Sequence, residues 1–243
     1  MWFLQIMAPD GFEILYEQGH VLAVNKPGGV LTQAPPGIDS LEVRVKRYLA
    51  ERHDDGRIVY LGVPHRLDRP ASGVLVLGLS IRTTRRLAEQ FEGRLVRKTY
   101  LALFEGQVDP PQGTWTDYLR KVEGEARSEV VAPDAPGGRI AVLHYRRIGH
   151  HAGVSCLEIE LETGRTHQIR VQAASRGLPV LGDAQYGARQ PFGPATEDPR
   201  ERWIALHARS LEFRHPATHE RVSVTAPLPT AWANASPALS ALP

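Results

Sequence analysis

Short apolar runs separated by turn residues constrain the fold of this chain more than any other feature. They lie at 14–16, 21–24, 74–77, 96–104, 140–148, 154–161, 204–213 and 221–224. Runs of this length between turn residues are typical of strands that follow one another through hairpins. Helix signals are confined to 39–50, 80–91 and 166–177. We therefore predict an α+β fold with a largely antiparallel sheet.

One stretch concentrates charge at the point where a loop runs into a buried strand. It is His65–Gly73, HRLDRPASG, in which Asp68 lies close to Arg66 and Arg69. Prolines within and before the loop limit its backbone freedom. A carboxylate held rigidly among cations can stay ionised and act as a nucleophile or a general base. An aspartate that only pairs with its neighbouring arginines would have the same local sequence.

Two later stretches carry complementary chemistry. The strand at 96–104 places Lys98 and Tyr100 on one face. At 163–171 a strand ends and a helix begins, with Thr166 as the expected N-cap and Arg170 in the first turn. The helix dipole does not favour a cation there, so we expect a carboxylate partner for Arg170 elsewhere in the chain. An aromatic side chain beside cations suits stacking on a nucleobase, and arginines suit contact with phosphate.

Composition excludes several other classes of protein. A net charge of +2 does not by itself indicate a nucleic-acid binder. The single cysteine, Cys156, allows no disulfide framework, which fits a cytoplasmic protein. The apolar start of the chain is short and lacks a basic flank, so we predict no signal peptide, and no run is long enough to span a membrane.

Metal and phosphate sites are also not expected. The histidines at 144, 150 and 151 have no carboxylate or cysteine ligand at usable spacing, so we predict no metal site. Lys26 lies in a glycine-rich turn and could meet a phosphate, but the spacing is not that of a P-loop. We interpret that segment as a structural turn.

Taken together, these stretches resemble the RluA family of RNA pseudouridine synthases. HRLDRPASG matches the HRLD loop of that family, KTYLAL its K-x-Y strand, and TGRTHQIRV its GR-x-HQ(I/L)R helix start. The likeness extends over residues 12–229, which we therefore expect to form the catalytic domain, with a disordered tail at 230–243. The resemblance implies the pseudouridine synthase fold, a mixed and mostly antiparallel sheet flanked by helices and loops, with an active-site cleft across the sheet.

The resemblance also implies roles for individual residues. Asp68 would be the nucleophile, Tyr100 would stack on the target uracil, Arg170 would pair with Asp68, Ile169 would pack near the base, and Arg66 would fill the space left by the flipped nucleotide. A base inside a helical stack must be extruded before an enzyme can reach it.

Four further residues match the motifs with less specific roles, RNA contact or structural support. They are His65, Lys98, Arg165 and His167.

The implied enzyme is a cofactor-free, cytoplasmic isomerase that converts uridine to pseudouridine in structured RNA. Its substrate would be ribosomal or transfer RNA. The enzyme would act as a monomer, with no obligatory protein partner and no association with a membrane. Two departures from the family pattern are Ala71 in place of the usual threonine and Gln172 where a histidine is frequent. The chain also begins close to the catalytic domain, so we expect no N-terminal S4 RNA-binding module.

Two other functions remain open at this point. A non-catalytic RNA-binding or RNA-folding module could keep the same surface without the chemistry. An aspartate-dependent hydrolase or phosphotransferase usually needs a second carboxylate or metal ligands, which these motifs lack.

Overall fold

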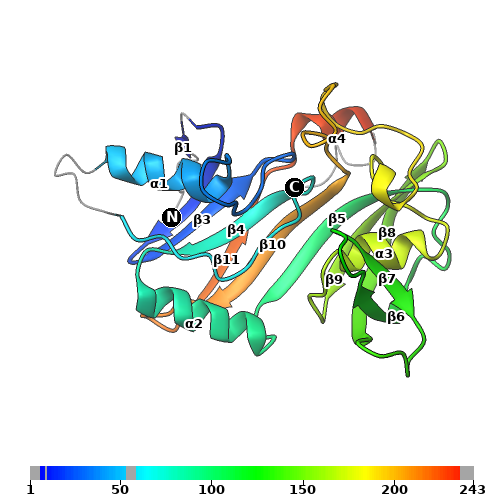
Figure 1. Cartoon of the computed structure of the whole chain (residues 1–243), viewed down its shortest axis with the longest axis horizontal. Helices are drawn as coiled ribbons and strands as arrows, with labels where there is room; N and C mark the ends of the chain where they lie inside the picture. Colours follow the sequence, from blue (N-terminus) through cyan, green and yellow to red (C-terminus); the bar gives the residue numbers. More distant parts are fainter. Residues whose placement is uncertain (1–5, 9, 53–58, 236–243) are drawn as a thin grey trace. The chain divides into compact units, whose positions relative to one another are not determined.

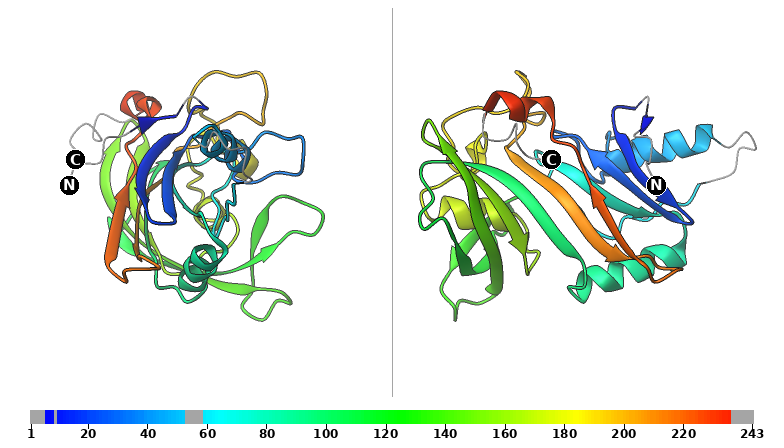
Figure 2. Two further views of the ribbon diagram at one scale, coloured as in Figure 1. Left: turned by 90° about the vertical axis from the view of Figure 1, so that its left-hand side faces the viewer. Right: turned by 180° about the vertical axis from the view of Figure 1, so that it is seen from behind.

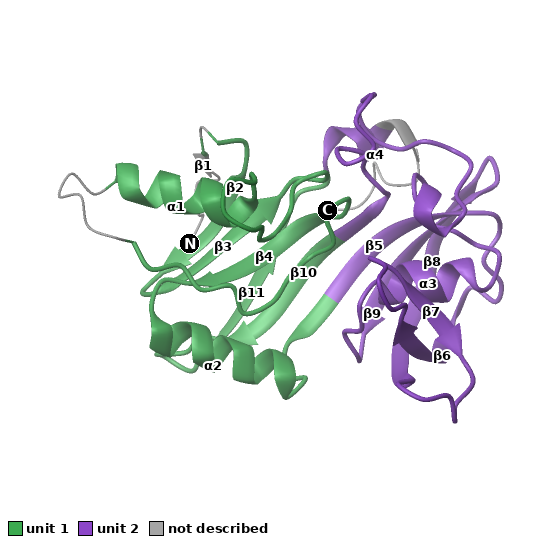
Figure 3. Cartoon of the chain, in the orientation of Figure 1, with its two compact units in different colours: residues 1–98, 208–228 green, residues 99–207, 229–243 purple. Residues whose placement is uncertain are grey.

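The computed structural model of the chain describes residues 6–8, 10–52 and 59–235. The chain forms two compact units: unit 1 is residues 1–98 with 208–228, and unit 2 is residues 99–207 with 229–243 (Figure 3). The chain passes from unit 1 to unit 2 within the strand β5 (Arg97–Glu105) and back within β10 (Leu206–Arg214). Each unit is therefore built from segments that are distant in sequence.

Unit 1 contains a sheet and two helices (Figure 1). Its other strands are β1 (Ile6–Met7), β2 (Glu13–Gln18), β3 (Val21–Lys26), β4 (Ser72–Gly78) and β11 (Arg221–Thr225). They lie in the order β1-β2-β3-β4-β10, and β11 runs antiparallel beside β10 (Figure 2). All seven residues of β4 are buried, as its uninterrupted apolar sequence predicts. The predicted hairpin of β2 and β3 and the predicted pair of β10 and β11 are confirmed.

A serine caps the start of each helix in unit 1. Ser40 precedes α1 (Leu41–Glu51), and its Oγ accepts a hydrogen bond from the amide of Val43 at 3.3 Å. Ser80 precedes α2 (Ile81–Glu92) and caps it in the same way. A serine oxygen at this position satisfies an amide that has no partner inside the helix. Leu87 of α2 is buried in a core cluster with residues of the strands, and Phe91 packs against that cluster.

Unit 2 contains a second run of antiparallel strands in the order β5-β9-β8-β6-β7. These are β6 (Gln112–Lys121), β7 (Ser128–Val131), β8 (Arg139–His151) and β9 (Val154–Leu161), followed by the helix α3 (Gln168–Ala174) and the short 3-10 helix η1 (Ala184–Tyr186). The strands β8 and β9 pair as far as His151 with Val154, so Ala152 and Gly153 alone form the turn between them.

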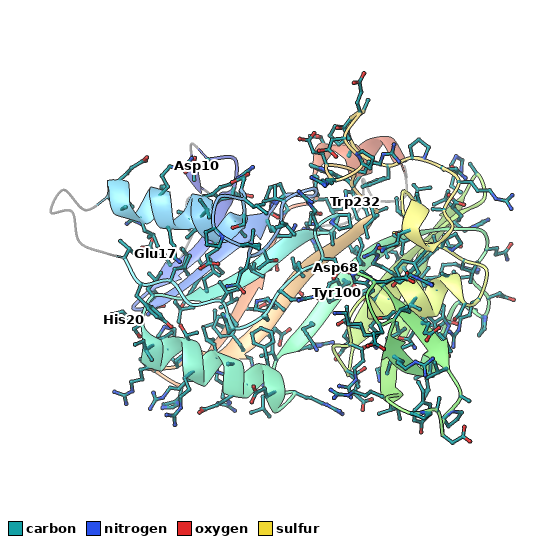
Figure 4. All side chains as sticks on the ribbon, in the orientation of Figure 1. Asp10, Glu17, His20, Asp68, Tyr100 and Trp232 are labelled. Atoms are coloured by element: carbon teal, nitrogen blue, oxygen red, sulfur yellow. The ribbon has the colours of Figure 1, made fainter. Side chains whose placement is uncertain are left out.

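Two boundaries differ from the prediction. The helix α3 begins at Gln168, so Thr166 is not its N-cap; His167 holds that position with a φ of 54° and makes no capping hydrogen bond. The tail is not disordered over Thr230–Ala235, where the chain forms α4 and buries Trp232 against Phe192 (Figure 4). The rest of the predicted disordered tail, 236–243, lies outside the described residues.

The predicted fold class is confirmed. The strand pairs described in both units are antiparallel. An isolated parallel bridge joins Gly106 to Val154, which makes the sheet mixed. Within the described ranges, the helices are all too short or too polar to cross a lipid bilayer.

Candidate active site

Asp68 lies in unit 1, in the loop that leads into β4, and is half-buried (Figure 4). The residue before it is fixed by the buried hydroxyl of Thr32. That hydroxyl accepts from the amide of Leu67 at 3.2 Å and donates to the carbonyl of Leu67 at 2.9 Å. A single side chain thus binds both polar main-chain groups of Leu67, so the backbone that enters Asp68 has little freedom.

The residue after Asp68 is fixed by a buried lysine. Lys26 at the end of β3 is fully buried, and its Nζ donates to the carbonyls of Pro27, Val30 and Arg69 at 2.8, 2.7 and 3.1 Å. The side chain of Arg69 also reaches back to the carbonyl of Gly29. The prediction of a structural turn around Lys26 is confirmed in a more specific form, because the lysine itself ties the turn to the Asp68 loop.

Charge and burial oppose each other at Lys26. Burial lowers the pKa of its ammonium to about 7, whereas the negative charge of Asp68 raises it. The three carbonyl acceptors match the three N–H groups that only the protonated form carries. This side of the loop therefore contains a cation that is electrostatically coupled to Asp68.

His65 has a structural position at the start of the loop. Its Nε2 accepts a hydrogen bond from the amide of Val76 on β4 at 2.9 Å, and its ring stacks on Phe91 with centroids 4.1 Å apart. Burial, followed by the charge of Lys98, lowers the pKa of His65 to about 3. A neutral imidazole is what this hydrogen bond requires, and the bond ties the start of the loop to β4.

Arg66 differs from His65 in exposure and in contacts. Its side chain is exposed and makes no hydrogen bond or ion pair to any other residue that the structure describes. Ala71, which replaces the usual threonine, is buried at 2% exposure. The loop keeps its main-chain anchors at Thr32 and Lys26 without a hydroxyl at position 71.

Tyr100 lies on β5 at the edge of unit 2 and is half-buried, opposite Ile159 of β9. Two residues earlier on the same strand, Lys98 is also half-buried. Burial, with the neighbouring charge of Arg94, lowers the pKa of Lys98. An aromatic and a cation thus lie two residues apart on one strand, and both side chains are half-buried.

The start of α3 is held by Gln168 in place of an N-cap. The side-chain oxygen of Gln168 accepts from the hydroxyl of Thr163 at 2.7 Å and from the amide of Arg165 at 3.0 Å, and its Nε2 donates to Val142 on β8. Arg165 in turn donates to the carbonyl of Ile140. These bonds close the turn before the helix and attach it to the sheet.

His167 occupies the left-handed backbone region, which is uncommon for residues other than glycine. Its Nδ1 lies 3.0 Å from the hydroxyl of Tyr186, which also accepts from the amide of Ser128. Strained positions of this kind gather at functional sites and persist only where the surroundings enforce them. The hydrogen bond to Tyr186 is one of the contacts that hold His167 in this conformation.

Arg170 is buried in the first turn of α3, and its expected carboxylate is present within unit 2. Its Nε and Nη2 donate to the two oxygens of Asp183 at 2.6 and 2.9 Å, and Nη2 also donates to Gln185 at 2.7 Å. The ring of Tyr186 lies 4.9 Å from its guanidinium carbon. Ile169, the preceding residue, is buried at 3% exposure.

The structure brings the predicted residues together in two groups. Unit 1 holds His65, Arg66, Asp68 and Lys98, and unit 2 holds Tyr100, Arg165, His167, Ile169 and Arg170. The predicted pair of Asp68 with Arg170 would join the two units and stays a prediction. Sequence reasoning missed the carboxylate of Asp183 and the anchoring hydroxyl of Thr32. Neither lies in a stretch whose local pattern indicates chemistry, although an arginine in a first helical turn already calls for a carboxylate.

The chemical inventory contains one half-buried carboxylate in a fixed loop, a buried arginine with fixed orientation and a partly exposed tyrosine. Among the described residues, no group of three or more histidine, cysteine, aspartate or glutamate side chains is arranged to hold a metal ion. A half-buried carboxylate suits nucleophilic or general-base chemistry, and a partly exposed tyrosine offers an aromatic surface to a flat substrate.

Comparison with known proteins gives a consistent result. Residues 20–175 match the model of a protein family described as RNA pseudouridylate synthase. The ribosomal large subunit pseudouridine synthase D of Pseudomonas aeruginosa is 33% identical over 226 residues, which cover 89% of this chain and 68% of that protein. An uncharacterized RNA pseudouridine synthase of Bacillus subtilis, YhcT, is 33% identical over 225 residues, covering 91% and 70%.

Solved structures agree on the fold. The human RNA pseudouridylate synthase domain containing 4 superposes with a TM-score of 0.74 at 22% identity, over 93% of this chain and 91% of that chain. The human RNA pseudouridylate synthase domain containing 1 superposes with a TM-score of 0.68 at 25% identity, over 93% and 87%.

Proposed function

Because the chain belongs to the RNA pseudouridylate synthase family, we propose that it isomerises uridine to pseudouridine in structured RNA with Asp68 as the nucleophile. The chain is an RNA pseudouridine synthase by its family. The proposal adds the residues that carry the reaction and the RNA on which it acts. The observation that supports it best is the main-chain fixation of Leu67 and Arg69, on either side of Asp68.

The reaction needs no external reactant. The bond from the ribose carbon C1′ to uracil N1 breaks, the uracil rotates, a bond from C1′ to carbon five forms, and the proton of carbon five leaves to solvent while N1 gains one. Asp68 forms a covalent bond either to the uracil ring, which keeps the detached base on the enzyme, or to ribose C1′, which leaves the base free to rotate in the site. In either route the bond to Asp68 breaks again before pseudouridine is released. A carboxylate can do this only if it is ionised and correctly placed, and the fixed loop favours correct placement.

Base flipping supplies the remaining roles. The target uridine leaves the stack, at a cost of a few kcal/mol, and its base stacks on Tyr100 with Ile169 nearby. Arg66 fills the gap, a role suited to its exposed and uncommitted side chain. Arg170 pairs with Asp68 and keeps it ionised, since an opposite charge within a few ångströms lowers the pKa of a carboxylate by roughly one to three units. His65, Arg165 and His167 support these groups through the contacts described above, and Lys98 contacts RNA.

Large-subunit ribosomal RNA is the first candidate substrate, because the Pseudomonas aeruginosa relative carries that substrate in its name. Transfer RNA is the second. Comparing pseudouridine maps of all cellular RNA with and without the gene identifies the target. A position that loses its modification in the deletion strain is expected in ribosomal RNA.

Release of tritium from carbon five of uracil tests the reaction. Wild-type protein, incubated with tritium-labelled total RNA from the deletion strain, is expected to release tritium in an amount that matches the pseudouridine formed. RNA binding without any release would contradict the proposal and favour the non-catalytic RNA-binding module. Release that disappears with a chelator would point to metal-dependent chemistry instead.

A further inference from the structure

Lys98, the last residue of unit 1 before the chain enters unit 2, is half-buried. Its ammonium has three N–H donors, but no hydrogen bond or ion pair joins it to any residue that the structure describes. The buried Lys26, by contrast, donates to three carbonyls, and the exposed Lys46 pairs with Glu42 at 2.7 Å. Removing an ammonium from water costs free energy unless a partner replaces the water. Lys98 therefore needs an acceptor from outside the chain.

The charges that act on Lys98 are of the wrong sign to replace such an acceptor. Burial lowers the pKa of Lys98, and the positive charge of Arg94 lowers it further. The charge of Lys98 in turn adds to the burial that lowers the pKa of His65 to about 3. Within the described ranges, no carboxylate offsets the charge of Lys98. Like charges at short range repel each other, and an anion between them removes that repulsion.

Arg94 lies in a strained turn between α2 and β5. It follows Gly93, the C-cap of α2, and has a φ of 57°, in the left-handed region that favours glycine. The amide of Leu95 closes the turn by donating to the carbonyl of Gln90 at 2.9 Å. Glycine at position 94 would close the same turn without strain, so the turn alone does not account for an arginine there. Strained residues gather at functional sites.

The loop of Asp68 begins close to these two cations. His65 opens that loop, its ring stacks on Phe91 of α2, and the charge of Lys98 acts on it. An anion bound by Arg94 and Lys98 would therefore lie near the loop, within unit 1. RNA carries a phosphate charge at every nucleotide, and lysine and arginine are the side chains that most often contact it.

We propose that Arg94 and Lys98 form a binding site for one backbone phosphate of the substrate RNA, next to the loop that carries Asp68. The inference rests on the proposed function only in taking RNA as the ligand. Both residues bind the RNA and take no part in the chemistry. The affinity that they add does not depend on the base sequence.

Retention of labelled RNA on filters over a range of KCl concentrations tests this site. The probe is radiolabelled total RNA from the deletion strain, which is bound without any reaction. The logarithm of the affinity falls with the logarithm of the salt concentration, by about 0.7–0.9 per phosphate that the protein neutralises. Lys98→Met is expected to weaken binding about threefold to tenfold and to flatten this slope by about one contact. Lys98→Arg keeps the charge and should restore most of both.

The matched control is Lys46→Met, which removes an exposed lysine on α1. It should bind RNA with the affinity and the salt slope of wild type.

Arg94→Gly separates binding from stability. Glycine accepts a φ of 57° without strain, so the urea midpoint should stay at or above that of wild type while the salt slope flattens as in Lys98→Met. Wild-type affinity and slope in both variants, or a loss of affinity no larger than their unfolded fraction explains, would overturn the inference. Binding of RNA without tritium release by wild type would instead refute the proposed function and leave the phosphate site in place.

Discussion

Asp68 and Arg170, the two charged residues of the proposed site, differ in whether the fold binds the main chain or the side chain. In unit 1, the fold binds the main chain on either side of Asp68, through Thr32 at Leu67 and Lys26 at Arg69. In unit 2, the fold binds the guanidinium of Arg170 directly, through Asp183. A nucleophile forms and breaks a bond during the reaction, so fixing the main chain beside it can place its carboxylate without removing its reactivity. A counter-ion keeps its bonding throughout the reaction and can be held by its own charged end.

Replacing Lys26 should give the largest change in stability among the variants that test this comparison. Lys26→Met leaves three buried carbonyls without their donor, and each such group costs about 1–3 kcal/mol. We expect a loss of several kcal/mol in the free energy of unfolding, and a loss of at least a hundredfold in tritium release by the folded fraction. Urea denaturation measures the first. Lys46→Met, on the exposed side of α1, is the control and should change stability by less than about 0.5 kcal/mol.

Low pH should lower the stability of the folded state, because His65 is held neutral in it. The folded state holds the His65 pKa at about 3, while the unfolded chain takes up the proton near 6.5. The stability that depends on neutral His65 is therefore complete above pH 6.5 and is lost as the pH falls toward 3, at about 1.4 kcal/mol per pH unit. His65→Gln should remove this dependence. Equal acid sensitivity in wild type and His65→Gln would contradict it, and the exposed His20→Gln serves as control.

Thr32→Val keeps the shape of the side chain and removes the hydroxyl that binds Leu67. Both main-chain groups of Leu67 then lose a partner, so we expect a loss of about 1–3 kcal/mol in the free energy of unfolding. The rate of tritium release should fall more than the stability of the folded state explains. A normal rate in a folded Thr32→Val protein would mean that Leu67 does not control Asp68.

Tyr186→Phe should have the smallest effect. It removes the hydroxyl that contacts His167 and Ser128 but keeps the ring beside Arg170. We expect a loss of about 1 kcal/mol in stability and less than threefold in rate. A loss of tenfold or more in rate would contradict this expectation and show that the hydroxyl of Tyr186 is needed for the reaction.

Much of the fold follows from local sequence signals. Ser40 and Ser80 cap their helices because each cap depends only on residues within the next turn. The local sequence predicts that Thr166 caps α3, and this prediction is wrong. Gln168 is bound to Val142 on β8, and this long-range contact outweighs the local cap signal. The tail from Thr230 has the composition of a disordered segment, yet Trp232 has apolar surface to bury and does so.

The sequence predicts the residues of the candidate site but not the residues that hold them in place. Asp68, Tyr100 and Arg170 lie in recognisable motifs. The groups that hold them do not, because Lys26 and Asp183 act through partners that are brought near only by folding. A buried lysine and a carboxylate in a tight turn have no local pattern that distinguishes them from ordinary turn residues.

Single-turnover tritium release by Asp68→Asn tests the central claim most directly. The substitution keeps the size of the side chain and removes its charge and nucleophilicity, while Asp134→Asn, an exposed aspartate in unit 2, is the matched control. We expect Asp68→Asn to bind RNA within threefold of wild type and to release no tritium above background, with Asp134→Asn at the wild-type rate. Release by Asp68→Asn at a rate near that of wild type would contradict the assignment of Asp68 as the nucleophile.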